Sequence, residues 1–281
     1  MHTDAWIREF WRRSFLLREM GDGLPPALKA SQWPNLETLN ASLKLPCLNA
    51  CKRLRLVPAQ PGDKADLGYE QRILARGEIT TRTHNWHDFF NALIWSRFPR
   101  LKQSLNAIHC AEIDQQHGRQ RNRRRDALTL FDECGVIVLS DNSRLLDCLA
   151  RHQWKGAFVD RRTCWEKHVQ VLAFGHALCA QALAPYSGWT ANALLLCQDG
   201  MDRLQPDRAR CARVDRELAA RVHQGAVLIT PADLSPLPLL GIPGMRERNA
   251  ERNATPTDYD DVAYFRPLPK NKAAAPVFNL G

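Results

Sequence analysis

The chain has no apolar run long enough to cross a bilayer. Its longest apolar stretches, such as Ala191 to Cys197, have the length of a strand, whereas a membrane helix needs about 20 predominantly apolar residues. The first residues also lack the basic start and the apolar stretch of a signal peptide. We therefore expect a cytoplasmic protein with no membrane partner.

Paired metal-binding cysteine motifs are absent as well. The nine cysteines are an odd number and lie mostly in apolar stretches, and Cys47 and Cys51 have no second Cys or His pair at zinc-finger spacing. Cysteines scattered in this way are typical of small buried side chains in a reducing compartment. We assign neither a disulfide nor a structural zinc site.

Three common catalytic templates are missing. The chain contains no Gly-x-x-x-x-Gly-Lys phosphate loop, no Gly-x-Gly-x-x-Gly after a strand, and no Gly-x-Ser-x-Gly elbow. These absences disfavour nucleotide-dependent transfer and serine hydrolysis. Cysteine catalysis has no distinctive Cys and His pair either.

Lysine is scarce, with 9 residues against 30 arginines in a chain of net charge +9. Guanidinium groups bind phosphate and carboxylate bidentately, so this composition permits nucleic acid or another polyanion as a partner. A coding bias toward arginine gives the same count. The run Arg119 to Arg125 holds five arginines in seven residues without an aromatic side chain, which fits a phosphate-contacting loop or, equally, a solvated loop.

The composition is otherwise that of an ordinary globular protein, with 44% hydrophobic and 25% charged residues. At 281 residues the chain is near the size at which a single core begins to divide, so we expect one domain. Predicted strands are few and include a hairpin. The expected fold is therefore α+β, a mostly helical single domain with a small mixed sheet that includes one β-hairpin.

Capping signals mark the clearest elements. Asn85 with Asp88 predicts the start of one helix, and Pro99 predicts the first turn of the next. Thr163 and Glu166 predict a long helix that ends at Ala184. Segments 127–133 and 136–140 predict a hairpin about a two-residue Cys-Gly turn. The remaining expectations are strands at 52–57, 157–160, 191–197 and 226–230, and helices at 6–17, 144–152 and 207–223.

Several segments occur together in a characteristic order. They are Tyr69-Glu70-Gln71-Arg72-Ile73, Thr81-Arg82, the run 85–93, the run 125–133, Phe174-Gly175-His176-Ala177-Leu178, the run 237–244, Tyr259-Asp260-Asp261 and Phe265-Arg266-Pro267. In these segments the chain resembles a proteobacterial family of proteins of unknown function, the one numbered three thousand and twenty-five. The resemblance runs from about residue 69 to residue 267 and implies no activity.

The resemblance suggests three regions. A family core domain occupies 67–267, an N-terminal helix and a proline-rich arm at 1–66 pack on it, and a C-terminal tail covers 268–281. Two positions depart from the family pattern. Cys134-Gly135 stands where Asn-Gly or Asp-Gly is expected, and Met245 stands where Trp is expected. Neither position carries a candidate reactive group.

Imidazole and carboxylate groups gather around the helix that is expected to begin at Asn85. Imidazole and carboxylate ligands together suit zinc, iron or manganese, and open positions on such an ion activate water. The candidate metal ligands are His84, His87, Asp132 and His176; the candidate catalytic residues are His87, Asp88, Glu133 and Glu70; the candidate substrate-binding residues are Arg82, Tyr69, Asn91 and Arg125.

Each candidate also has a structural interpretation. Asp88 serves as a helix cap, Asn91 bonds to backbone, and the histidines are satisfied polar groups at the edge of the core. His176 shares a predicted helical face with apolar residues, which is typical of a buried, hydrogen-bonded histidine. Gly175 inside a helix predicts that another backbone or a ligand approaches closely. Of the two histidines, we expect His87, which opens a helix among acidic residues, to be functional and His176 to be mainly structural.

The favoured function is a hydrolase that acts on a phosphorylated or otherwise anionic substrate and is assisted by a divalent metal if the imidazoles hold one. In that case the histidines and acids ligate the ion or transfer protons, and Arg82 meets the substrate's charge. Two alternatives remain. One is a basic module that binds nucleic acid or another polyanion through Arg119 to Arg125, and the other is a non-catalytic scaffold.

Overall fold

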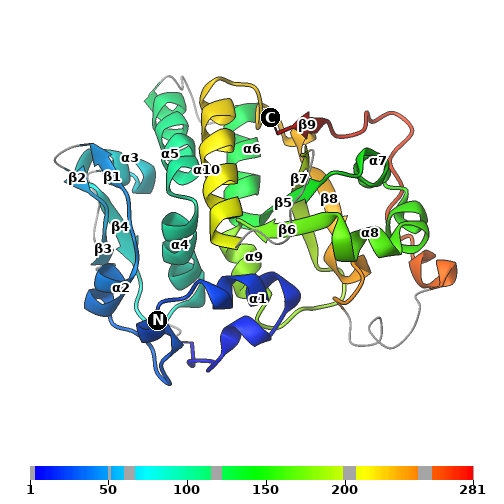
Figure 1. Ribbon diagram of the computed structural model, residues 1–281. Helices are drawn as coiled ribbons and strands as arrows, with labels where there is room; N and C mark the ends of the chain where they lie inside the picture. Colours follow the sequence, from blue (N-terminus) through cyan, green and yellow to red (C-terminus); the bar gives the residue numbers. More distant parts are fainter. Residues whose placement is uncertain are drawn as a thin grey trace.

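A computed structural model describes residues 4–49, 52–59, 67–114, 122–198, 207–245 and 255–280 (Figure 1). Its main sheet has five strands: β6 (Val169–Ala173), β5 (Gly135–Ser140), β7 (Thr190–Cys197), β8 (Ser235–Pro238) and β9 (Val277–Asn279). β7 lies parallel to β5 and β9 and antiparallel to β8, and β6 pairs antiparallel with β5. Every residue of β5 and β6 is buried, as expected for strands that are apolar except for Ser140 and Gln170.

A smaller group of strands lies on the other side of the long helices (Figure 1). β3 (Arg55–Pro58) pairs in parallel with β4 (Glu78–Thr81), and β1 (Cys47–Asn49) pairs antiparallel with β2 (Lys52–Arg53). The expected α+β fold, a mostly helical single domain with a small mixed sheet and a hairpin, is therefore confirmed. The hairpin, however, is β1–β2 and not the segment 127–140.

The long helices lie between the two groups of strands. They are α4 (Trp86–Arg97), α5 (Pro99–Asp114), α6 (Arg123–Cys134) and α10 (Asp207–His223), with α3 (Tyr69–Arg76) packed on α5. The side chain of Asp215 on α10 accepts hydrogen bonds from the backbone N–H groups of Arg100 and Leu101, at 3.1 and 2.8 Å. A carboxylate from another helix thus satisfies two N–H groups that the first turn of α5 leaves open.

Shorter helices complete the fold. They are α1 (Phe15–Asp22), α2 (Leu36–Ser42), α7 (Ser143–Ala150), α8 (Arg162–Lys167) and α9 (His176–Gln181), 3₁₀ turns at Phe10–Arg12, Pro26–Lys29, Pro231–Asp233, Leu239–Gly241 and Pro256–Tyr259, and a π-helical turn at Gly156–Asp160. In the described part of the chain, no helix combines the length and the apolar character that crossing a membrane would require.

The predicted hairpin at 127–140 is wrong. Its first arm belongs to α6, whose N-terminal cap is Asn122, and only its second arm is a strand, β5. The side chain of Asn122 accepts a hydrogen bond from the backbone N–H of Arg125 at 2.9 Å, which is the usual role of an Asn cap. A period-2 interpretation of the short apolar run 127–133 overlooked this cap.

The predicted helix from Thr163 to Ala184 is also wrong. The structure has α8, then strand β6, then α9, because Val169–Ala173 pairs with the buried strand β5 along its whole length. The π-helical turn replaces the strand expected at 157–160, and no strand forms at 226–230. Near the N-terminus, α1 begins only at Phe15. Sheet pairing and tertiary packing override local propensity at these places.

Candidate metal centre

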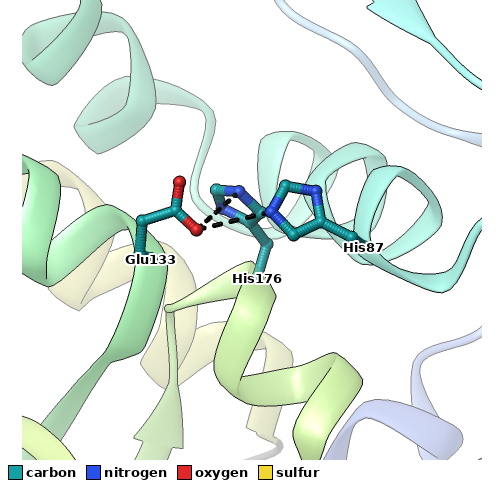
Figure 2. A group of neighbouring side chains, drawn as sticks. All are labelled: His87, Glu133 and His176. Atoms are coloured by element: carbon teal, nitrogen blue, oxygen red, sulfur yellow. Dashed lines mark hydrogen bonds and ion pairs between the residues drawn. The ribbon is translucent and has the colours of Figure 1, made fainter.

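Three side chains from three separate helices converge at one point (Figure 2). They are His87 on α4, Glu133 on α6 and His176 on α9, and one ligand atom from each lies within 4.8 Å of the others. Glu133 Oε2 is 3.4 Å from His87 Nε2 and 3.5 Å from His176 Nε2. The two imidazole rings meet edge to face, with centroids 4.3 Å apart. We call these three residues the His–Glu–His cluster.

The start of α4 is held from two directions, and this places His87. The Asn85 side chain accepts a hydrogen bond from the backbone N–H of Asp88 at 3.1 Å, as the sequence predicts for its cap. The carboxylate of Asp4 accepts a second one, at 3.0 Å, from the backbone N–H of Trp86. A residue near the N-terminus therefore helps to cap the helix that carries His87.

Glu133 and His176 are placed by a close contact between backbones. Glu133 lies in the last turn of α6, and the backbone N–H of Gly175 donates to the carbonyl of Gly135 at 2.8 Å. A methyl group on Gly175 would lie only 2.4 Å from the backbone nitrogen of Gly135. The close backbone approach predicted at Gly175 is confirmed, but Gly175 is the N-terminal cap of α9 and His176 is its first residue.

A carboxylate lies behind His87. Asp88 Oδ1 is 3.1 Å from His87 Nδ1. Arg82 donates two hydrogen bonds to the same carboxylate, from Nε at 2.9 Å and from Nη2 at 2.8 Å. Burial alone would raise the pKa of Asp88, but the bonds from Arg82 and His87 hold it well below its ordinary value. Hydrogen bonds to Asp88 and then to Glu133 raise the pKa of His87 to about 9.

A second carboxylate lies behind His176. Asp132 Oδ2 is 3.9 Å from His176 Nδ1, and Asp132 Oδ1 accepts a 2.6 Å hydrogen bond from Lys102. Burial would raise the pKa of Asp132, yet the Lys102 charge lowers it. His176 is only 4% exposed, and burial lowers its pKa to about 4, so its ring is neutral. Its Nδ1 has no hydrogen-bond partner within normal distance.

The buried cation Lys102 extends this network toward α3. Its ammonium group also donates to Asn91 Oδ1 at 3.1 Å, and Asn91 Nδ2 donates to the Tyr69 hydroxyl at 2.7 Å. Two predicted substrate-binding residues, Asn91 and Tyr69, are thus joined to the carboxylate behind His176. An amide and a phenol held this way orient the Lys102 head group.

This arrangement has the composition of a divalent metal site. Two imidazole nitrogens and one carboxylate oxygen are ligands of zinc, iron and manganese, and catalytic zinc sites keep three protein ligands and an open fourth position. Ligating histidines commonly donate their other ring N–H to a carboxylate. Asp88 stands in that position for His87, and Asp132 stands close to it for His176.

A polar cavity of about 180 Å³ adjoins the cluster. It is lined by Glu70, His109, Arg125, Thr129, Asp132 and Glu133, so Glu133 belongs both to the cluster and to the cavity wall. Glu70 accepts hydrogen bonds from Asn106. Burial, and next the negative charge of Asp132, raise the pKa of Glu70.

Most of the predicted site residues lie close together in the structure, but some of them occupy a different place in the site from the one that the sequence predicted. His84 is exposed and its ring faces Trp33, with centroids 5.8 Å apart, so it is outside the cluster. Asp132 lies behind an imidazole, and Glu133 supplies the converging carboxylate oxygen. Arg82 is engaged by Asp88.

Sequence reasoning missed a polar stripe on α5. Lys102, Asn106 and His109 recur at helical spacing and are all buried, between the apolar residues Leu101 and Leu105 and their neighbours. Buried polar groups at positions i, i+4 and i+7 share one helical face. The same periodicity argument that located the core would have singled out this stripe.

The arginine run is divided by the structure. Arg119 and Arg121 lie outside the described residues, and Arg123 is exposed at the start of α6. Arg124 donates to the carbonyl of Val222 at 3.0 Å, while Arg125 lines the cavity. Binding of nucleic acid or another polyanion by this run stays a prediction.

Most of the chain matches the model of one protein family. The model of a family described as "Protein of unknown function (DUF3025)" matches residues 54–269. Comparison with the curated proteins found no match, and comparison with the solved structures found none either. The matched range contains the His–Glu–His cluster and every residue that lines the cavity, whereas Asp4 precedes it.

Proposed function

The chain belongs to this family of proteins of unknown function (DUF3025), and we propose that it is a hydrolase that holds a divalent metal ion in the His–Glu–His cluster. The observation that carries the proposal is the convergence of His87 Nε2, Glu133 Oε2 and His176 Nε2, with a carboxylate near the far nitrogen of each ring. Zinc, iron or manganese suits this ligand set.

Both rings have a carboxylate on the side of Nδ1, 3.1 Å away for His87 and 3.9 Å away for His176. Arg82 fixes Asp88 behind His87, and Lys102 fixes Asp132 behind His176, so each imidazole can present its Nε2 with the proton kept on Nδ1. The neutral state of His176 leaves its Nε2 lone pair available. His87 must give up a proton before it ligates, so ion binding releases that proton.

The cluster is open on one side, which hydrolysis requires. The side chains of His87 and Glu133 are 38% and 44% exposed, whereas that of His176 is 5% exposed. A bound divalent ion supplies an acidified water at such an open position. Hydrolysis would join the water oxygen to the substrate's carbon or phosphorus and break that atom's bond to the leaving group, so a nearby carboxylate would have to take a proton from the water and return one to the leaving group. Glu70, which lines the adjoining cavity, is the carboxylate that we assign to this proton exchange.

Metal content is the first test. The full-length chain, purified without an affinity tag, should contain close to one equivalent of zinc, iron or manganese by elemental analysis. His87→Ala, His176→Ala and Glu133→Gln should each lose most of it. His84→Ala is the matched control, because it removes a nearby imidazole that is outside the cluster. Equal metal content in all four variants would contradict the proposed site.

Hydrolysis is the second test. p-Nitrophenyl phosphate and p-nitrophenyl acetate report phosphoester and ester cleavage without knowledge of the natural substrate. Turnover should disappear after treatment with a chelator and return when one divalent metal is added back. Glu70→Gln should lower turnover without changing metal content. Turnover that survives complete metal removal would rule out the proposed mechanism.

A further inference from the structure

Every residue that lines the cavity beside the His–Glu–His cluster has a polar side chain. Three helices enclose it: α3 contributes Glu70, α5 contributes His109, and α6 contributes Arg125, Thr129, Asp132 and Glu133. Ordinary ligand pockets are lined mostly by apolar and aromatic side chains with a few polar groups. This lining instead suits a small, charged or strongly polar group, and its volume of about 180 Å³ limits the size of that group.

Two carboxylates of the lining already have basic partners. Lys102 donates to Asp132 at 2.6 Å, and Nε2 of His87 lies 3.4 Å from Oε2 of Glu133. The third, Glu70, accepts a hydrogen bond from the Asn106 amide; burial and then the charge of Asp132 raise its pKa, while the charges of Lys102 and Arg125 lower it. Each carboxylate of the wall therefore has a basic group beside it, either in the lining or just behind it.

The hydrogen-bond donors of the lining point to the kind of group that fits. Arg125 carries a planar guanidinium that matches the oxygens of a phosphate or a carboxylate, and Thr129 lies one helical turn farther along the same face of α6. His109 of α5 also lines the cavity. A guanidinium, a hydroxyl and an imidazole around one small space form a set of donors for an oxyanion.

We propose that this cavity binds an oxyanion group of the substrate, a phosphate or a carboxylate, with Arg125 as its principal contact and Thr129 and His109 as further contacts. The proposal rests on the hydrolase function above, because it places the substrate's anionic end beside Glu133 and hence beside the water to be activated. Among the predicted substrate-binding residues, the proposal prefers Arg125 to Arg82 for this role, because Asp88 accepts hydrogen bonds from two nitrogens of the Arg82 side chain.

Titration of the full-length, metal-free chain with inorganic phosphate and, separately, with sodium acetate tests the proposal by calorimetry. Metal removal is needed because phosphate also binds metal ions. At least one of the two anions should bind saturably, and the stronger one identifies the class of oxyanion. Arg125→Gln should weaken that binding at least tenfold, and Arg125→Lys should weaken it less, because a lysine keeps the charge but loses the fork of donors.

Arg123→Gln is the matched control. It removes the same charge from the same helix, two residues away, at an exposed position that does not line the cavity. Binding that is unchanged in Arg125→Gln, or equally weakened in Arg123→Gln, would overturn the proposal. If Arg125→Gln does not fold, Thr129→Val replaces it, with a smaller loss of affinity expected.

Metal analysis of the same samples separates this proposal from the hydrolase function. A chain that holds metal but binds neither anion would refute the oxyanion site alone. A chain that binds an anion through Arg125 but holds no metal would refute the metal centre and leave the oxyanion site standing.

Discussion

Replacement of Gly175 by alanine should break the contact that sets the spacing of the cluster. The added Cβ would lie 2.4 Å from the backbone nitrogen of Gly135, 2.5 Å from the carbonyl oxygen of Glu133 and 2.6 Å from the Cα of Cys134. All three atoms belong to consecutive backbone positions, so no side-chain rotation relieves the clash. Either the end of α6 or the start of α9 must move by about 1 Å to restore ordinary contact distances.

The cost follows from two opposing effects. Overpacking of this kind costs about 1 to 3 kcal/mol and occasionally more, while a Gly→Ala change recovers about 0.4 to 1 kcal/mol by restricting the unfolded chain. Gly175 has φ −66°, which alanine adopts readily, so backbone strain adds nothing. Because the clash involves rigid backbone, we take the upper end of the overpacking cost and expect a net loss of about 2 kcal/mol of unfolding free energy and a Tm lower by about 3 to 5 °C.

Thermal denaturation of the metal-free chain measures this loss. Gly23→Ala is the control, since the nearest atom to its added Cβ is 3.9 Å away and its φ of −90° also suits alanine. The control should melt within about 1 °C of the natural chain. Metal content should fall in Gly175→Ala, because the shift separates Glu133 from His176. A Tm for Gly175→Ala that matches the control would refute the close backbone approach.

Three further predictions concern the charges around the cluster. Lys102→Met should lower the unfolding free energy by about 3 to 5 kcal/mol, because it leaves the buried Asp132 carboxylate without its cation, and chemical denaturation checks this. The folded pKa of Asp88 lies well below its unfolded value, so its stabilising contribution is complete above about pH 4 and declines as the pH falls from there toward the folded pKa. The Tm difference between the natural chain and Asp88→Asn should therefore stay constant from pH 7 to pH 5 and shrink only below about pH 4. In the metal-free chain, His176→Ala should lower the unfolding free energy by about 2 to 4 kcal/mol and His87→Ala by about 1 kcal/mol or less, because of the two only His176 is buried. Thermal melts of both variants check this. A larger loss for His87→Ala than for His176→Ala would contradict these assignments.

The sequence alone determined the features that depend on neighbouring residues. The cap at Asn85 and the proline at position 99 located the starts of α4 and α5, because capping is an interaction over three or four residues. The apolar run 191–197 was correctly interpreted as a strand. Short segments that occur in a characteristic order along the chain were sufficient to identify the family. The concentration of His and acidic residues near position 87 also indicated the region of the site.

Elements that depend on distant pairing were decided only by the tertiary structure. Val169–Ala173 is a strand because it pairs with β5, and its own sequence is compatible with a helix. Segment 127–133 has too few apolar residues for its period to distinguish a helix from a strand, and packing in the folded chain selected the helix.

The choice of metal ligands was likewise a tertiary decision. His87 and Glu133 are 46 positions apart in the chain, and the sequence favoured Asp132 over Glu133 as the ligand. Adjacent residues near the end of a helix point in directions about 100° apart, so only the placement of α6 against α4 and α9 determines which carboxylate meets the imidazoles. That placement depends on the contact between Gly175 and Gly135, where two backbones approach more closely than any side chain would allow.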